Sequence, residues 1–151
     1  MDKTIVTAFL VIAGIISAVF VFNSIYPAIV QSNDAMSSME RRMDERLKSQ
    51  VTVIHATGSG STTLVWVKNV GSLRIAPVEK CDVFFGPEGN FARVTYGTAA
   101  GQWQYLVENG TEWNPTATVK LTINSGLTPG TRYFFKIVLP NGVADEYFFS
   151  G

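Results

Sequence analysis

The chain begins with an apolar run that carries no charge. Residues 4–22, TIVTAFLVIAGIISAVFVF, contain no charged side chain, and the uncharged stretch continues to Asn33. In a helix built from this run, apolar side chains lie on every side, which is typical of a helix that is buried all round. About 17–25 such residues cross a bilayer, so the pattern predicts a transmembrane helix or the core of a multi-subunit helical bundle. A cleaved secretory signal fits less well, because the run is long and follows Asp2-Lys3.

Small residues interrupt the apolar run at helical spacing. Ala13 with Ser17, and Gly14 with Ala18, form small-xxx-small pairs, which let helix backbones approach closely. Such residues are also simply common in apolar helices. We expect the packing surface of this helix to comprise the small residues and the large apolar side chains around them, namely Ile5, Phe9, Ile12, Ala13, Gly14, Ile16, Ser17, Ala18 and Phe20.

After Pro27 the pattern becomes amphipathic. Met36, Met39, Met43 and Leu47 recur at spacings of three and four, and charged residues occupy the other faces between positions 40 and 48. We expect this methionine stripe to pack on the downstream domain or on a neighbouring subunit, while the charged face is solvated. No strong stop signal lies between positions 4 and 50, so Pro27 is expected to kink one long helix or to break it briefly.

From residue 51 the period of apolar positions changes from helical to two. Turns rich in Gly, Pro and Asn, such as Pro129-Gly130, separate short β-rich runs. The expected strands lie near residues 51–56, 63–69, 81–85, 91–96, 102–107, 116–123, 132–139 and 146–149. Strands of this number and length are typical of an antiparallel, immunoglobulin-like β-sandwich.

The predicted fold class is therefore α+β, with a long N-terminal apolar helix followed by this sandwich. The helix is assigned to residues 1–50, apolar over 4–30 and amphipathic over 31–50. The sandwich is assigned to residues 51–151.

Charge and cysteine content exclude several classes of function. Twelve basic and twelve acidic residues cancel, so the chain lacks the basic excess that a nucleic-acid partner requires. Cys81 is the sole cysteine and His55 the sole histidine, so neither a disulfide scaffold nor a Cys/His zinc site can form. Cys81 is expected to pack in the core.

The sandwich offers little candidate chemistry. A Ser-His-Asp site would have to use His55, and no G-x-S-x-G motif accompanies it. The Asp145-Glu146 pair lacks a calcium-binding loop around it, and the tryptophans and the aromatic run 147–149 are expected in the core. We therefore expect no catalytic residue, no cofactor, no metal and no small-molecule substrate. Asn109, in the sequence Asn109-Gly110-Thr111, is a possible N-glycosylation site if it lies outside the cell.

An apolar N-terminal helix, its amphipathic extension and a β-sandwich together resemble the type IV pilin superfamily. Within it the chain is most similar to archaellins, the filament subunits of the archaeal motility organelle. Residues 65–71, VWVKNVG, resemble a strand-and-turn segment of archaellins and of their membrane-anchored accessory relatives. Ile5 stands where bacterial pilins carry Glu, counting from Met1, and the cysteine pair of many pilins is missing. No basic-Gly leader precedes Met1, so the sequence is either a processed form or an uncleaved membrane protein.

The resemblance implies two alternative functions. The leading one is a structural subunit of an extracellular, archaellum-type filament. Its helix would be held in the membrane before assembly, would meet the archaellum assembly machinery, and would then join copies of itself in the filament core. The second is an accessory protein, permanently anchored by the helix, whose sandwich binds a surface-layer or other extracytoplasmic partner. A membrane-tethered enzyme is a third possibility, for which the sequence offers no cluster of titratable groups.

Overall fold

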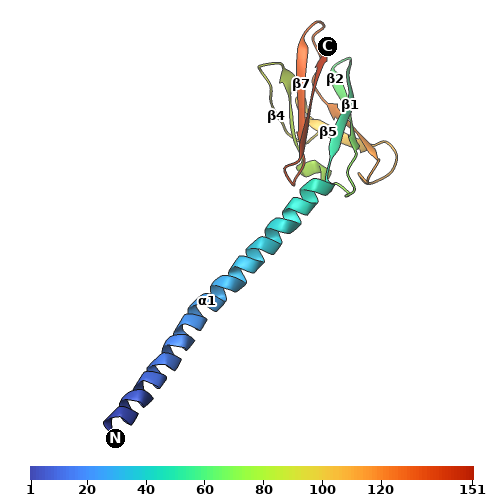
Figure 1. Ribbon diagram of the computed structural model, residues 1–151. Coiled ribbons are helices and arrows are strands. Elements are labelled where there is room, and N and C mark those ends of the chain that lie inside the picture. The colour runs from blue at the N-terminus through green and yellow to red at the C-terminus, as the bar shows by residue number, and fades with distance from the viewer. The chain divides into compact units, whose positions relative to one another are not determined.

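A computed structural model describes all residues from Met1 to Gly151. One long helix, α1 (Asp2–Lys48), precedes a β-rich domain (Figure 1). The strands are β1 (Val51–Ser59), β2 (Thr62–Asn69), β3 (Asp82–Pro87), β4 (Ala92–Val94), β5 (Trp103–Val107), β6 (Thr118–Ile123), β7 (Arg132–Val138) and β8 (Ala144–Ser150), with a short 3₁₀ helix, η1 (Val78–Lys80), before β3. The predicted α+β fold class is confirmed. The chain forms two compact units, Met1–Arg42 and Met43–Gly151, and the change from helix to strand lies between Lys48 and Val51.

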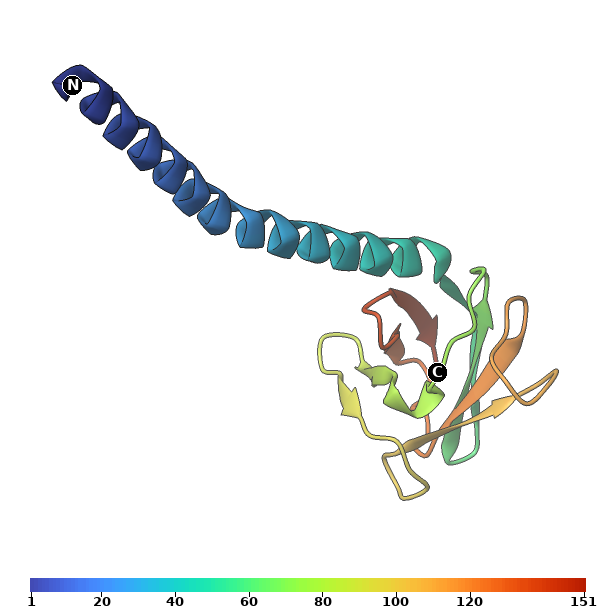
Figure 2. The ribbon, with the colours of Figure 1, turned by 90° about the horizontal axis from the view of Figure 1, so that it is seen from below.

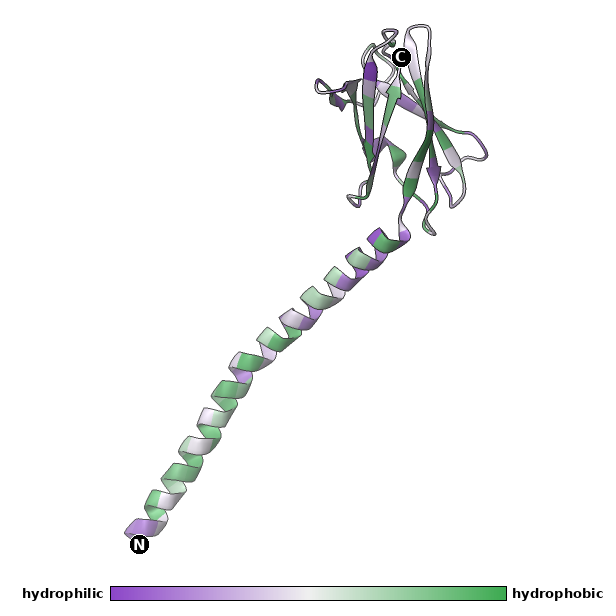
Figure 3. Ribbon diagram, turned by 45° about the horizontal axis from the view of Figure 1, so that its top comes forward, coloured by the Kyte–Doolittle hydropathy of each residue, from purple (hydrophilic) through white to green (hydrophobic).

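Helix α1 continues without interruption through Pro27. It curves gently along its length (Figure 2), as long helices commonly do, and it does not break at Pro27. Apolar residues dominate its first part, and polar residues increase toward Lys48 (Figure 3). By length and composition α1 is able to cross a membrane, and none of its residues is buried within the chain.

The β-rich domain consists of two antiparallel, four-stranded sheets. One has the strand order β1-β2-β6-β5 and the other β4-β3-β7-β8. Because side chains alternate between the faces of a strand, each sheet contributes one row of apolar residues to a shared core. This core includes the fully buried side chains of Val65, Leu121, Trp103, Phe135 and Ile137.

All eight expected strands are present, with shifted ends. The strand expected over residues 91–96 is limited to Ala92–Val94. The strand expected from residue 116 begins at Thr118, because Thr116 has a φ of 70°, which is incompatible with an extended strand.

One side of the sandwich is held by a hydrogen bond between its two sheets. The pairing of β1 with β2 is irregular between Val53 and His55. There the backbone N–H of Val53 donates to Asp145 Oδ2 of β8 at 2.8 Å. Because β1 and β8 are the edge strands of the two sheets, this single carboxylate joins the sheets along that side.

We expect Asp145→Ala to lower the free energy of unfolding by about 1–3 kcal/mol, because it leaves the part-buried N–H of Val53 without an acceptor. Asp145→Asn retains an acceptor oxygen and should lose less. Urea unfolding of the detergent-solubilised chain, followed by tryptophan fluorescence, measures both. Glu146→Ala, which removes an exposed neighbouring carboxylate, is the control. Equal midpoints for Asp145→Ala and the unaltered chain would show that this bond contributes nothing.

Candidate functional site

The residues predicted to form the packing surface of α1 all lie on the helix with their side chains exposed. Ile5, Phe9, Ile12, Ile16 and Phe20 are between 51% and 71% exposed, and Ala13, Gly14, Ser17 and Ala18 are exposed as well. This apolar surface is therefore available to lipid or to another helix.

Polar side chains within the apolar segment are satisfied by the helix itself. The Ser17 hydroxyl donates to the Ala13 carbonyl at 2.8 Å, and the Thr7 hydroxyl donates to the Lys3 carbonyl at 2.7 Å. Such bonds remove the cost of placing a hydroxyl in a medium without water. The segment thus suits an apolar environment in its polar as well as its apolar residues.

The methionine stripe is exposed too, at 59% for Met36, 65% for Met39 and 61% for Met43. Met43 and Leu47 belong to the same compact unit as the sandwich, and Leu47 is 81% exposed. The sandwich of the same chain therefore does not cover these two residues, and the packing of the stripe on a neighbouring subunit stays a prediction.

The last turn of α1 is joined to the loop after β2 by backbone hydrogen bonds. The Lys48 carbonyl accepts from the N–H of Ser72 at 2.8 Å. The Gln50 carbonyl accepts from Val70 and Gly71 at 2.9 and 3.0 Å. A Cβ at position 71 would collide with the carbonyl oxygen of Lys48, so the backbones can approach this closely only at a glycine. We call these contacts between residues 48–50 and 70–72 the helix-end clamp.

Two asparagines support the helix-end clamp. Asn69 is fully buried, and its amide donates to the carbonyls of Leu73 and Trp113 at 2.8 and 3.2 Å while its oxygen accepts from Gly71 N–H at 3.0 Å. Asn141 donates to Ser49 Oγ at 2.7 Å, and its carbonyl accepts from Arg46 Nε at 3.0 Å. Sequence reasoning missed both roles, although the Asn69-Val70-Gly71 and Pro140-Asn141-Gly142 turns were visible signals.

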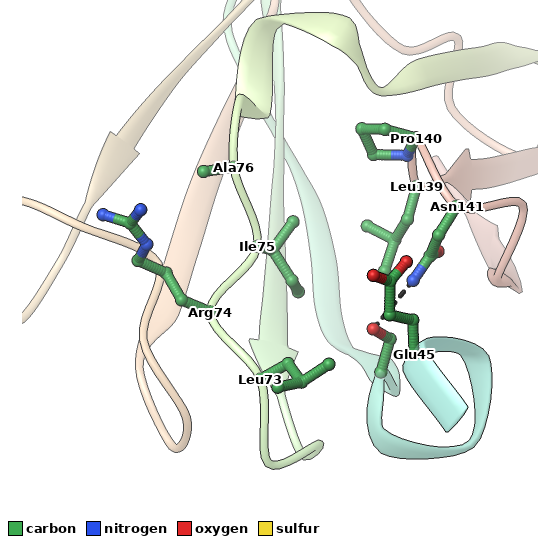
Figure 4. Close-up of a pocket in the computed structure, with 9 residues that line it drawn as sticks. Glu45, Leu73, Arg74, Ile75, Ala76, Leu139, Pro140 and Asn141 are labelled. Carbon is green, nitrogen blue, oxygen red and sulfur yellow. Dashed lines mark hydrogen bonds between the residues drawn. The ribbon is translucent and has the colours of Figure 1, made fainter. Parts of the chain in front are cut away.

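A groove of about 550 Å³ lies beside the helix-end clamp (Figure 4). Figure 4 shows the apolar side chains of Leu73 and Ile75 on one side of it and Leu139 with Glu45 on the other, and Ser49 also lines it. Arg74 also lines the groove but forms an ion pair with Glu112. At the edge of the groove the Ser49 hydroxyl accepts a hydrogen bond from the Asn141 amide at 2.7 Å.

A second exposed surface is aromatic and lies on the outer face of the β4-β3-β7-β8 sheet. Phe134 packs against Phe91 and Phe148, with ring centroids 4.4 and 5.1 Å apart, and the Arg132 guanidinium lies 5.0 Å from the Phe148 ring. Phe91 is 47% and Phe148 41% exposed, so this aromatic patch presents both apolar area and a cation–π pair to solvent. Arginine and aromatic residues together are typical of protein–protein contacts. For Phe148 the expectation of a core position is therefore wrong.

The titratable residues do not form a reactive site. The exposed His55 stacks on Trp66 at 5.7 Å. Burial raises the pKa of the Cys81 thiol to about 12, and the charges of Asp82 and Glu79 contribute. As expected, Cys81 is a buried core residue. No group of three or more His, Cys, Asp or Glu side chains is placed to hold a metal ion. Asn109 is exposed. The absence of enzymatic activity and the glycosylation of Asn109 stay predictions.

One polar pair on the sandwich is electrostatically coupled. The Tyr105 hydroxyl donates to Glu79 Oε1 at 2.6 Å. This hydrogen bond lowers the pKa of Glu79 and raises the pKa of Tyr105 to about 12.

Known proteins share the sequence and the fold of this chain. The archaellum periplasmic stator protein FlaG from Sulfolobus acidocaldarius is 30% identical, and the match covers 67% of this chain and 99% of FlaG with a TM-score of 0.60. The chain belongs to the family of the archaellum stator protein FlaG. A chain of the solved archaellum periplasmic stator protein complex of FlaF and FlaG from Sulfolobus acidocaldarius matches with a TM-score of 0.59 at the same identity, over 66% of this chain and 88% of that one. An uncharacterised protein of Archaeoglobus fulgidus is 28% identical over 97% of both chains. No family model matches.

Membership of the FlaG family decides between the two expected functions. The chain is related to an accessory protein of the archaellum and not to archaellin itself, so the comparisons favour the second expectation over a filament subunit. They give no support to self-assembly into a filament. The layout of an apolar helix before a sandwich led to the correct organelle, and the sequence similarity to FlaG separates the accessory protein from the filament subunit.

We expect Gly71→Ala to lower the melting temperature of the sandwich by several degrees, because the added methyl group displaces the backbone that bonds to Lys48 and Gln50. Thermal unfolding of the solubilised chain by circular dichroism measures the change. Ser72→Ala is the matched control, since it keeps the N–H that bonds Lys48. An unchanged melting temperature for Gly71→Ala would contradict the close approach at this position.

Alkaline pH should destabilise the sandwich between about pH 9 and pH 12. The unfolded thiol and phenol ionise near pKa values of about 8.5 and 10, whereas in the folded chain Cys81 and Tyr105 ionise only near 12. Stability is therefore complete below the unfolded pKa values and falls as the pH rises above them. Melting temperatures between pH 7 and 11 should fall less steeply for Cys81→Ala and Tyr105→Phe than for the unaltered chain. Parallel curves would exclude both groups as the cause.

Proposed function

We propose that this chain is a membrane-anchored accessory protein of the archaellum that acts as a stator component. In this function α1 is a permanent anchor, and the sandwich lies outside the cytoplasm and binds another extracytoplasmic protein. The observation that carries the proposal is the match of this chain to nearly the whole of a solved FlaG stator protein. No catalytic function is proposed.

The anchor is supported by the physical chemistry of α1. Burial of each large apolar side chain contributes about 1.5–3 kcal/mol, and residues 4–22 expose many of them in every direction. A helix of this kind is unstable in water, while lipid satisfies all of its faces at once.

A stator component must hold its domain against a moving part, and the helix-end clamp supports such a role. Three backbone hydrogen bonds tie residues 48–50 to residues 70–72. The side chains of Arg46 and Asn141 add two further connections. Because residues 46, 48, 49 and 50 each take part in one or more of these bonds, the last turn of α1 cannot rotate freely against the strand that follows it.

The aromatic patch supports binding to a partner protein. Its exposed rings surround Phe134, which is only 7% exposed, and Arg132 adds a charged group that can contact a polar partner. A solved relative, FlaG, occurs in a complex with FlaF. For this chain we propose an extracytoplasmic protein of the archaellum as the partner of the patch.

We expect Phe148→Ala to leave the chain folded and in the membrane while reducing recovery of archaellum accessory proteins with it by at least tenfold. The reason is that Phe148 is exposed and supplies the outer ring of the patch. Tagged chain is purified from detergent-extracted membranes of a motile host, and swimming is scored in parallel. Leu106→Ala, which removes an exposed side chain from the other sheet, is the matched control.

Three results would overturn parts of the proposal. Release of the chain by alkaline carbonate washing would exclude a permanent anchor. Equal partner recovery for Phe148→Ala and Leu106→Ala would exclude the aromatic patch. Recovery of the chain as the main component of purified surface filaments would restore the filament subunit as its function.

A further inference from the structure

One face of helix α1, taken at alternating spacings of four and three from Thr4 to Met43, is apolar at every position between these two residues except Ser32. We call this face the seam. Through the most apolar part of the helix the seam consists of Val11, Ile15, Ala18, Phe22, Ile25 and Ile29. A repeat of seven residues with two apolar positions is the pattern by which parallel helices pack side by side.

The seam keeps its phase where the helix changes from apolar to amphipathic. It continues through Ser32, Met36, Met39 and Met43. Every charged residue of α1 between positions 4 and 43 lies off the seam, and so does Pro27. Between positions 4 and 22 apolar residues occupy every face of the helix, so lipid accounts for the seam there. Lipid does not explain the three exposed methionines that continue the seam among charged residues.

Two apolar hollows lie along the same face. One, of about 560 Å³, is lined by Thr4, Ala8 and Val11 of the seam together with their neighbours. The other, of about 500 Å³, includes Ala18 and Phe22. Small alanine side chains between larger ones form a hole of the kind that receives a side chain from a facing helix.

We propose that α1 pairs in parallel and in register with the α1 of a second copy of this chain through the seam. The inference rests on the membrane anchor proposed above, because anchoring gives all copies one orientation and one depth. Each seam residue then lies beside the same residue of the other copy. In this arrangement the apolar positions of one helix pack against the apolar positions of the other.

The residues that flank the seam agree with a second copy as the partner. Met36 and Met43 each lie four residues after the preceding seam position. In a parallel pair, the residue just before each of them faces the residue of the partner helix that lies five positions further along the chain. Arg42 then faces Leu47, and Ala35 faces Glu40, so no like charges meet. Leu47, which is 81% exposed in the single chain, gains the apolar stem of Arg42 as a neighbour.

The seam ends where the helix becomes tied to its own domain. The next position in the repeat is Arg46, whose Nε donates to the Asn141 carbonyl at 3.0 Å. Pairing through the seam therefore leaves the helix-end clamp unchanged, and the paired face extends over 40 residues, or about 60 Å of helix at 1.5 Å per residue.

Cysteine crosslinking in membranes tests the seam directly. Met36→Cys, Met39→Cys and Met43→Cys are compared with Ser37→Cys, Ser38→Cys and Arg41→Cys in the full-length chain, after oxidation with copper phenanthroline. The chain with only its buried Cys81 is the blank. We expect the seam positions to form disulfide-linked dimers of two copies at least fivefold more than the others, with their composition established by mass spectrometry.

A charge on the seam provides a second test. In a double variant, Met39→Lys should abolish the crosslink that Met36→Cys forms, while Ser38→Lys, one position away, should retain it. The two substitutions add the same charge to the same turn, so a difference between them arises from the seam.

The inference is overturned if crosslinking shows no alternation of three and four, if the linked product contains a different protein, or if only residues of different number become linked. The last result would indicate staggered helices, as in a helical filament. If the chain resists carbonate washing while any of these results is obtained, the seam is excluded and the proposal of a membrane anchor stands. Loss of the chain from washed membranes would overturn the anchor together with the seam.

Discussion

The close approach of two backbones at Gly71 is the constraint on which this structure depends. The helix ends at Lys48 and the first strand begins at Val51, and the carbonyls of Lys48 and Gln50 both accept hydrogen bonds from the loop after β2. A side chain at position 71 would push the two segments apart. The change from a helical period to a period of two therefore occurs at a point that is held by backbone hydrogen bonds rather than by side-chain packing.

A buried asparagine, Asn69, makes this constraint specific. Asn69 could in principle lower stability, because a buried amide without partners costs several kcal/mol. Instead its donors and acceptor are used by Leu73, Trp113 and Gly71. The amide thereby connects β2 with two separate loops at the same end of the sandwich. An apolar residue of similar size would fill the space but would not select one arrangement of these loops.

Local patterns were sufficient to predict most of the fold. The alternation of apolar residues and the Gly-rich turns located every strand, because burial on one face of a sheet directly selects alternate residues. The helix-end clamp could not be located in this way, since its contacts join positions as distant as Ser49 and Asn141. The exposed position of Phe148 was missed for a related reason. An alternating strand has two faces, and the sequence does not state which of them meets the core.

The functional assignment shows the same limit at a larger scale. An apolar helix before a sandwich suits a filament subunit and an anchored accessory protein equally well, because both must reside in lipid. Lipid contacts every face of a helix alike and so places no demand on the phase of its apolar residues. A second helix contacts one face only, and it does place such a demand. Within residues 4–22 every phase is apolar, so the seam is distinct only from Ile25 and Ile29 onward to Met36, Met39 and Met43, and this continuation is the feature of α1 that lipid does not account for. The seam also continues into the charged part of the helix. In a part of a helix that water surrounds, apolar residues at a regular spacing are expected only where another surface covers them. A helix that served as an anchor alone would have no physical reason to keep that phase.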